Sequence, residues 1–549
     1  MNTENNTIAI YGIQDIDGEI YPNIVHDHSI AIYRNGKIKK FIQIERLTRK
    51  KYDNSMPLNI YRILKEEGIF KNRNYDLIFV DNILGSAFIS EEGKIRFEGN
   101  NLNYLEANHF LGKAYWLDRE IIAYGLSHEL AHIFSCIPFY GKFKENSLLI
   151  HFDGGASKSN FSAWTYKNGK IKLIEYHWEL KYLSSFFNSN ALIFSILNGN
   201  VKNQHSIPGK FMGFAAYGKY SEEIENWLFL NDYFSEWGNN KKFFDIVKSD
   251  WNIILNSFDL NNELIRNITA TFHHIFIRET IKRIAKLNEK LKTDYLYFTG
   301  GSALNIALNS ELLKSNTFKD IFIPPCTNDS GLAIGAGAYL ELLKGNSIKD
   351  HNVFLNNFKI NSEVKYNLDS IKKVANVLIK NGIVGICNGF GEAGPRALGN
   401  RSILALANSK KLASRLSQQI KKREWYRPLA PVMLESNAKK FTGLSTIHHL
   451  SKYMLLEFNI LLEFRQEIEG VVHENGTARI QSIFNKDDNP FIYDLLNYLN
   501  HIYNIKALIN TSFNSNNEPL VHTAEDAMNS MNKMKLDGLV LNGKLLGNL

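Results

Sequence analysis

The sequence predicts an α/β protein of at least two domains, with an internal duplication in its N-terminal part. Three observations predict this. β-like runs alternate with helical runs along the chain. The length of 549 residues exceeds what one hydrophobic core usually supports, and the composition, 44% hydrophobic and 22% charged, is that of a globular protein. Finally, residues 29–39 (SIAIYRNGKIK) resemble residues 162–172 (SAWTYKNGKIK).

Each of the two similar strings predicts a hairpin that turns at an Asn-Gly pair, because both residues accept the positive φ of a type I′ turn. A short acidic loop precedes each hairpin, His26-Asp27 in the first case and Asp153-Gly154-Gly155 in the second. Any two Asn-Gly hairpins share some features, but the matching upstream loops favour duplication. Two such lobes are the arrangement of the actin-like and sugar-kinase-type ATPase fold, in which ligands bind between the lobes.

Further elements follow along the chain. The sequence predicts strands at 295–298, 321–325, 383–387 and 507–509, and helices that begin at Ala303 or span 332–343 and 371–380. A polar, charged stretch lies between the two sets of elements. We therefore expect an N-terminal domain over 1–350, a linker over 351–370 and a second α/β domain over 371–549.

The charge of the chain is +8 overall but is concentrated in one region. Between Gly391 and Ala430 there are nine Lys/Arg against two Asp/Glu. Such a block suits an anionic small molecule at least as well as a polynucleotide, and we expect no nucleic-acid partner. The three cysteines form no disulfide or metal-binding pattern, and no signal peptide or membrane span is evident, which favours a cytoplasmic location and no membrane partner.

His128 and His132 stand four residues apart in HELAH, so a helix would place both imidazoles on one face, where they can chelate a metal. Histidines at this spacing also cap or pack helices, and the string matches the HExxH of zinc proteases, which need a third downstream ligand. Asp329 is a further carboxylate ligand or the N-cap of the next helix, a role that Ser330 could also fill. Two imidazoles and one carboxylate suit Fe(II), Mn(II) or Zn(II).

Two glycine pairs lie where backbone amides could meet a phosphate. Gly300-Gly301 separates a predicted strand from a helix, and Gly154-Gly155 follows another strand. Either pair could equally form a tight turn.

Cations and polar groups recur through the C-terminal part. Apolar residues such as Trp425 interleave with the charges, which argues against a solvated basic helix. We therefore predict a basic, phosphate-sized site. Its candidate residues are Arg396, Arg401, Lys421, Arg423, Arg427, Arg479, Asn510 and Ser512.

The chain as a whole resembles the nodulation and antibiotic-biosynthesis O-carbamoyltransferases. The matching strings occur in family order over nearly the whole chain. They are HDHS, ERLTRKK, HELAH, PGKFMGFAAYG, FTGGSALNIALNS, PPCTNDSGLAIGAGAYL, GEAGPRALGNRSILA, KKREWYRPLAPVM and INTSFNSNNEPLVHTAEDAM. Relatives commonly carry a second histidine directly before the metal pair, where this chain has Ser127.

The resemblance implies a domain similar to the tRNA threonylcarbamoyl-transfer proteins, followed by a YrdC-like domain. The latter would convert carbamoyl phosphate and ATP, with Mg²⁺, to carbamoyl adenylate. The carbamoyl group would then pass to a hydroxyl of a small molecule, such as a secondary metabolite or sugar, at the metal site of the first domain. A homodimer is compatible with this arrangement.

The resemblance also implies roles for individual residues. His128, His132 and Asp329 would hold the metal, with Fe(II) favoured. The nucleotide would contact Gly154, Gly155, Gly300, Gly301 and Asn305, while Lys421 and Arg423 would act in adenylate formation beside the other basic and polar residues. His26, with Asp27, is the candidate general base for the acceptor hydroxyl, or only orients its loop.

Three other functions fit parts of the sequence. A small-molecule kinase of the same fold would leave the basic C-terminal part unexplained. A non-catalytic partner in tRNA threonylcarbamoylation would bind tRNA. A metalloprotease fits only the HELAH string. The acceptor is not encoded in any motif, and its pocket is expected among the loops 176–201 and 227–258.

Overall fold

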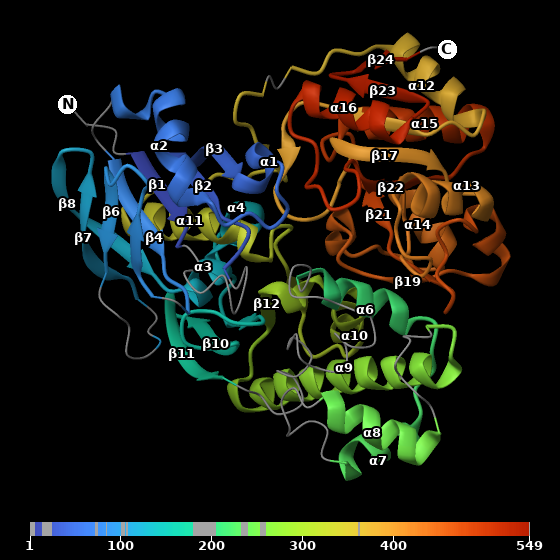
Figure 1. The fold of residues 1–549 in the computed structure, drawn as a ribbon, viewed down its shortest axis with the longest axis horizontal. Helices are drawn as coiled ribbons and strands as arrows, with labels where there is room; N and C mark the ends of the chain where they lie inside the picture. The colour runs from blue at the N-terminus through green and yellow to red at the C-terminus, as the bar shows by residue number, and fades with distance from the viewer. Residues whose placement is uncertain are drawn as a thin grey trace.

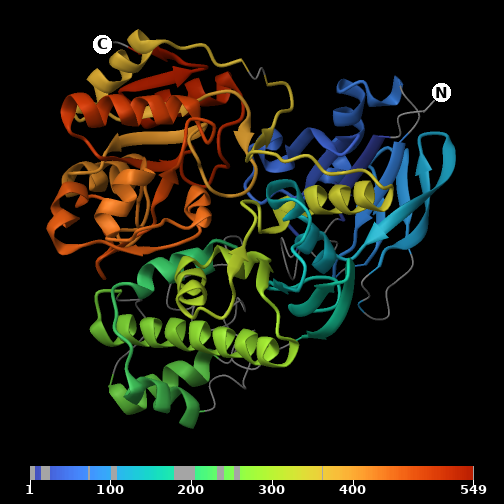
Figure 2. The ribbon, with the colours of Figure 1, turned by 180° about the vertical axis from the view of Figure 1, so that it is seen from behind.

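The computed structural model describes residues 6–13, 25–71, 75–83, 85–99, 105, 108–178, 205–231, 240–252, 260–360 and 363–547. Three main sheets organise these residues (Figure 1). Seen from either side, the C-terminal part, orange to red, lies beside the blue first lobe and next to the green helices of the second lobe (Figure 2). Among the described residues, no helix is both long enough and apolar enough to cross a bilayer.

The first sheet has ten strands in the order β16-β14-β3-β2-β1-β4-β8-β7-β6-β5, and the second has five in the order β11-β10-β9-β12-β13. The first consists of β1 (Asn6–Tyr11), β2 (Ser29–Arg34), β3 (Lys37–Gln43), β4 (Tyr75–Val80), β5 (Ala87–Ile89), β6 (Ile95–Glu98), β7 (Phe110–Trp116), β8 (Arg119–Leu126), β14 (Phe354–Asn356) and β16 (Gly391–Glu392). The second consists of β9 (Ser147–Phe152), β10 (Phe161–Lys167), β11 (Lys170–His177), β12 (Tyr295–Thr299) and β13 (Asp320–Phe322).

The two sheets share one topology, which confirms the predicted duplication. In the first, β3-β2-β1 pair antiparallel, and β4 and β8 add in parallel. In the second, β11-β10-β9 pair antiparallel, and β12 and β13 add in parallel. Both Asn-Gly pairs have positive φ, 51° and 70° at Asn35-Gly36 and 53° and 70° at Asn168-Gly169, as a type I′ turn requires. The N-terminal part is therefore a duplicated actin-like fold.

Helices of the N-terminal part connect or cover these sheets. They are α1 (Ile44–Thr48), α2 (Met56–Glu66), α3 (His128–Phe134), α4 (Ile137–Tyr140), α6 (Ile207–Ala215), α7 (Glu222–Leu230), α8 (Asn240–Trp251), α9 (Glu263–Leu291), α10 (Ile306–Lys314) and α11 (Leu332–Leu343). By position, α3 and α11 are equivalent, since each follows the last strand of its lobe, and they pack against each other between the sheets. A site built at their N-terminal ends therefore lies between the lobes.

The C-terminal part is a third α/β unit around a seven-stranded sheet in the order β21-β18-β22-β17-β15-β23-β24. Its strands are β15 (Val384–Cys387), β17 (Arg401–Leu406), β18 (Ala430–Leu434), β21 (Gln481–Ile483), β22 (Ala507–Ser512), β23 (Gly538–Leu541) and β24 (Lys544–Leu546), with a separate pair β19 (Phe458–Asn459) and β20 (Thr477–Ala478). Its helices are α12 (Leu368–Ile379), α13 (Lys410–Ser414), α14 (Glu435–Thr442), α15 (Pro490–Tyr503) and α16 (Ala524–Met534).

The predicted elements lie close to the observed ones, with one difference at the expected linker. Residues 354–356 within it form β14, which pairs with β3 and with β16 from the C-terminal part. The stretch between the two parts is thus partly built into the first sheet. The division into 1–350, 351–370 and 371–549 stays a prediction.

Replacing Gly335 by alanine is expected to destabilise the contact between α3 and α11. A Cβ atom there would lie 1.8 Å from the carbonyl oxygen of Ala131, so the helices must separate, at a cost of about 1–3 kcal/mol. Urea unfolding measures this cost. Gly209→Ala is the matched control, because its Cβ would meet nothing within 4 Å. Equal stability of the two variants would contradict the close packing.

Candidate metal centre and anion-binding cavity

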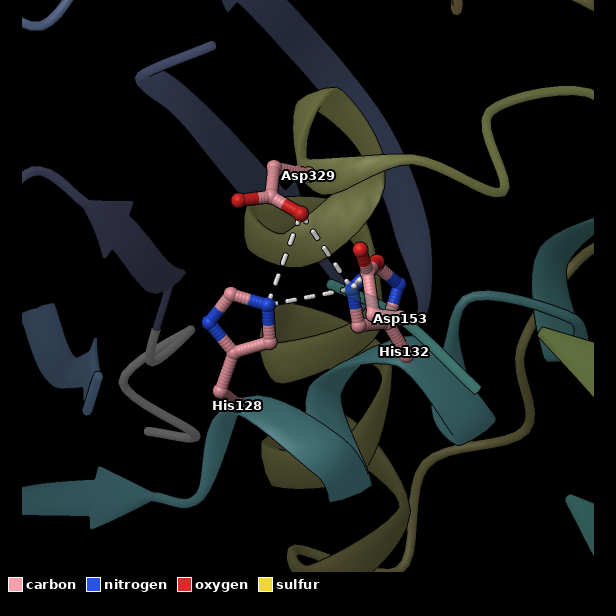
Figure 3. Close-up of side chains that lie close together, drawn as sticks. All are labelled: His128, His132, Asp153 and Asp329. Atoms are coloured by element: carbon pink, nitrogen blue, oxygen red, sulfur yellow. Dashed lines mark hydrogen bonds and ion pairs between the residues drawn. The ribbon is translucent and has the colours of Figure 1, made fainter. Parts of the chain in front are cut away.

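Four side chains from three separate segments converge between the lobes (Figure 3). His128 and His132 project from one face of α3, and their Nε2 atoms lie 3.1 Å apart. Each Nε2 is 3.4 Å from Oδ1 of Asp329, and His132 Nε2 is also 3.4 Å from Oδ2 of Asp153. Ser127 caps α3 by accepting the N–H of Leu130 at 3.3 Å, so it supports the helix that presents the pair.

The donor set fits a divalent transition metal. Both histidines are buried, and the Nδ1 atoms of both have no hydrogen-bond partner. Burial alone would raise the pKa of Asp329, but the charges of His128 and His26 and hydrogen bonds from both metal-site histidines hold this pKa well below its ordinary value. Two imidazoles and two carboxylates whose ligand atoms all lie within 4.8 Å of one another suit Fe(II), Mn(II) or Zn(II), and three of these four residues are the ones expected from the sequence.

Two residues of this centre were not predicted from the sequence. Asp153 directly follows the end of β9 and precedes Gly154-Gly155, a position at which ligands often bind in α/β folds. Its Oδ2 also accepts the N–H of Gly301 at 2.7 Å. Tyr11 donates its hydroxyl to Oδ2 of Asp329 at 2.9 Å and so orients the carboxylate. Nothing in the sequence near Tyr11 indicates this contact.

Replacing Asp153 by asparagine is expected to weaken metal binding at least about tenfold. The amide keeps an acceptor for Gly301 but loses the negative charge. Calorimetric titration of the metal-free protein with Mn²⁺ measures the change. Asp27→Asn is the control, because Asp27 is a buried carboxylate in the same cavity but outside the donor set. Equal Mn²⁺ affinity of wild type and Asp153→Asn would remove Asp153 from the centre.

His26 is held beside this centre by its neighbour in the chain. Its Nδ1 lies 3.0 Å from Oδ2 of Asp27, which also accepts the side-chain N–H of Asn328 at 3.0 Å. Burial lowers the pKa of His26, but the charges of Asp329 and Asp27 outweigh it and raise the pKa to about 9. With its Nδ1–H donated to Asp27, the imidazole keeps Nε2 for another partner. A cation held by Asp329 would offset the negative charge of that carboxylate, which favours the protonated form of His26.

The glycine pairs have different surroundings. Gly154, Gly155 and Gly301 line the cavity described below, as does Asn305, whose side chain caps α10 and contacts His273. Gly300 is outside the lining. Its φ is +93°, and a Cβ there would lie 2.3 Å from the carbonyl oxygen of Phe152. Gly300 is therefore required by the close approach of two strand ends.

The predicted basic residues of the C-terminal part divide into two groups. Arg396, Arg423, Arg427 and Arg479 line the cavity, together with Asn510 and Ser512. Arg401 is buried outside it and donates four hydrogen bonds to the carbonyl oxygens of Asn388, Gly389, Asn400 and His522. Because all these bonds go to the main chain, Arg401 holds the fold together at this point rather than facing an anion.

Lys421 lies just behind the cavity wall. Its ammonium group donates to the backbone of Ser512 and Asn514 and to the Asn514 side chain. Burial, then Arg423, Lys51 and Arg427, hold the pKa of Lys421 well below its ordinary value. In front of it, Arg423 donates to Thr511 Oγ1 and Ser512 Oγ, both at 3.0 Å.

Arg479 lies among these cations and is half-buried. Its Nε has no hydrogen-bond partner, and burial and the neighbouring Arg396, Arg423 and Arg427 hold its pKa well below the ordinary value. The nearby Glu424 pairs with Lys210 at 2.7 Å and more loosely with Arg427 at 3.7 Å. A group of mutually repelling guanidinium groups on a cavity wall is the electrostatic requirement of a polyanion site.

One cavity of about 1460 Å³ connects the two groups of residues. Its lining includes His26, His128, Asp153 and Asp329, here called the metal end, and the four arginines, here called the arginine end. The C-terminal part and the second lobe both contribute to its middle, where Arg396 donates to the carbonyl oxygen of Leu304 at 3.3 Å. A molecule in this cavity can reach both ends without leaving it. Much of the predicted acceptor loops, residues 179–201, 232–239 and 253–258, lies outside the described residues.

A second group of metal-type donors, Asp320, His448 and His449, differs from the first. Both Nε2 atoms face Oδ1 of Asp320, at 2.9 and 3.2 Å. The Nδ1 of His448 accepts the N–H of Leu450, so its proton resides on Nε2 and is donated to Asp320. This group is a hydrogen-bonded contact between β13 and the helical turn His449–Tyr453.

Comparisons with known proteins agree along the whole chain. The family model described as "Carbamoyltransferase N-terminus" matches residues 20–338, and that described as "Carbamoyltransferase C-terminus" matches residues 375–547. Nodulation protein NolNO of Sinorhizobium fredii is 26% identical over 569 residues, which cover 96% of this chain and 79% of that protein. Nodulation protein U of Azorhizobium caulinodans is 33% identical over 259 residues, 45% of each chain. Among solved structures, full-length HypF in its phosphate- and nucleotide-bound form is 11% identical, with a TM-score of 0.32 over 64% of this chain and 57% of that one.

Proposed function

Because this chain belongs to the carbamoyltransferase family, we propose that it is an ATP-dependent O-carbamoyltransferase that acts through carbamoyl adenylate on a hydroxyl of a small molecule. The family membership agrees with the resemblance indicated by the ordered motifs. The observation that carries the proposal is the single cavity with a group of arginines at one end and a metal-type donor set at the other.

The arginine end suits the formation of the adenylate. Arg396, Arg423, Arg427 and Arg479 would bind the phosphate groups of carbamoyl phosphate and ATP, and Ser512 and Asn510 would add neutral hydrogen bonds. In the first step of adenylate formation, water would release orthophosphate from carbamoyl phosphate and leave carbamate. The resulting carbamate oxygen then attacks the α-phosphorus of ATP, and pyrophosphate leaves. Lys421 would support this site from behind Ser512 and Asn514.

The other end suits carbamoyl transfer. A metal held by His128, His132, Asp153 and Asp329 would supply Lewis acidity toward the oxygen atoms of the adenylate. His26, oriented by Asp27, would accept the proton of the acceptor hydroxyl at Nε2 as that oxygen attacks the carbamoyl carbon. AMP then leaves, and Gly154, Gly155, Gly301 and Asn305 would contact the nucleotide. An enclosed path between the ends would protect the mixed anhydride from water.

The decisive experiment incubates the metal-loaded protein with ¹⁴C-carbamoyl phosphate, Mg²⁺-ATP and a panel of sugar, aminoglycoside and nucleoside acceptors. We expect AMP, pyrophosphate and a labelled carbamoyl ester. Formation of ADP and a phosphorylated acceptor would instead identify a kinase. A folded, metal-loaded protein that consumes no nucleotide under any of these conditions contradicts the proposal, and tight, salt-sensitive tRNA binding in that case would favour a tRNA-modification partner.

A further inference from the structure

A short basic segment of the first lobe reaches the anion-binding end of the cavity. This segment, here called the basic arm, comprises residues 49–52 (Arg-Lys-Lys-Tyr) directly after α1. Arg49 and Tyr52 both have a φ of +59°, so the backbone is left-handed at both ends of the arm. Lys51 and Tyr52 line the cavity, whereas Lys50 does not.

The arm is fixed to the C-terminal part by directed contacts. Arg49 donates to the carbonyl oxygens of Leu520 at 2.6 Å and Pro519 at 3.0 Å, and its Nε lies 3.5 Å from Asp526. On the other side of α1, the buried Arg46 donates to the carbonyl oxygen of Gly394 at 3.1 Å, two residues before Arg396. The arm therefore has a defined place relative to the arginines, although it belongs to the other half of the chain.

The loop that Arg49 holds is part of the anion-binding end itself. Asn514 donates to the carbonyl oxygen of Glu518 at 2.6 Å and accepts from Lys421 and from Ser512. Ser512 in turn accepts from Arg423. Arg49 thus binds one end of a hydrogen-bonded loop whose other end positions Lys421 and Arg423.

We propose that Lys51 is a substrate-binding residue that brings a cation from the first lobe to the phosphoryl group bound by the C-terminal arginines. The inference rests on the proposed function. The side chain of Lys51 is exposed toward the cavity, with its Nζ 4.8 Å from the ring centroid of Tyr52, and it is close enough to Lys421 to lower the pKa of that residue. A lysine that lines the cavity beside these like charges is suited to an arriving dianion.

The ligand class is a phosphoryl anion, which two substrates supply. The two candidate ligands of Lys51 are the phosphate of carbamoyl phosphate and the triphosphate of ATP. The kinetic constants for the two substrates distinguish these sources. With either substrate, the anion site includes both Lys51 from the first lobe and the arginines from the C-terminal part. The site is therefore complete only when these two parts of the chain are in contact.

The test compares Lys51→Met with Lys50→Met, an adjacent exposed lysine outside the cavity lining. AMP formation is measured at varied carbamoyl phosphate and at varied ATP. We expect the KM of one substrate to rise about tenfold in Lys51→Met, with kcat changed less than about threefold. Lys50→Met should match wild type, and Lys51→Arg should restore most of the loss. Unchanged KM values for both substrates in Lys51→Met overturn the proposal.

A binding measurement separates this inference from the proposed function. Calorimetry with inorganic pyrophosphate and with orthophosphate needs no turnover. Weaker binding of either probe to Lys51→Met than to Lys50→Met supports the role of Lys51 even if wild type forms no AMP, in which case only the proposed reaction fails. Equal binding of both probes to the two variants removes Lys51 from the anion site.

Discussion

Replacing Arg479 by methionine is expected to abolish formation of AMP and pyrophosphate without destabilising the protein. Arg479 is half-buried beside three other arginines, and its Nε has no hydrogen-bond partner. In the folded protein its charge is therefore uncompensated, and removing it costs little or stabilises the fold. When phosphates are bound, the same charge becomes favourable. We expect kcat/KM for carbamoyl phosphate to fall at least about a hundredfold, while the urea midpoint stays equal or rises.

Arg401→Met is the matched control for Arg479→Met. Both arginines belong to the C-terminal part, but Arg401 is fully buried and donates to four main-chain carbonyl oxygens. Its removal leaves these acceptors without their donors and is expected to cost about 3 kcal/mol or more of stability. Refolded Arg401→Met protein should retain anion binding. If Arg479→Met unfolds as readily as Arg401→Met and still binds pyrophosphate, the assignment of an anion-binding role to Arg479 and a structural role to Arg401 is wrong.

Replacing His132 by alanine is expected to remove the metal and stop carbamoyl transfer, while adenylate formation continues. His132 Nε2 lies within 3.4 Å of His128, Asp153 and Asp329, so it joins all other members of the donor set. The arginine end of the cavity lies on a different part of the chain. We expect transfer to fall at least about a thousandfold, with AMP and pyrophosphate still formed from carbamoyl phosphate and ATP.

Two measurements separate the effects at the metal end. Metal content after gel filtration, by elemental analysis, should fall to background in His132→Ala and stay at the wild-type level in Asp27→Asn. Transfer should be lost in both variants, because Asp27 is proposed to orient His26 rather than to bind the metal. Loss of AMP formation in His132→Ala along with loss of transfer would contradict the assignment of the two steps to opposite ends of the cavity.

Local signals predicted much of the fold. The Asn-Gly turns, the repeated string around them and the small-residue helix 332–343 all appear in the structure, because turn conformation and helical periodicity depend on neighbouring residues. The spacing of His128 and His132 likewise needed only one helical turn to bring the imidazoles together. The expected linker was less accurate, since β14 forms only when β3 and β16 are present to pair with it.

By itself, then, the sequence determined the duplicated α/β fold, the family, the histidine pair and the presence of a basic site, since each depends on residue type and short spacing. Only the tertiary structure decided which similar residues act differently. Arg401 and Arg479 look alike in sequence, yet one binds carbonyl groups and the other faces a cavity. Asp153 and Lys51 acquire their candidate roles from partners far away in the sequence, at Asp329 and near Lys421. Contacts at that separation depend on how the sheets and the two halves of the chain pack, which no local pattern encodes.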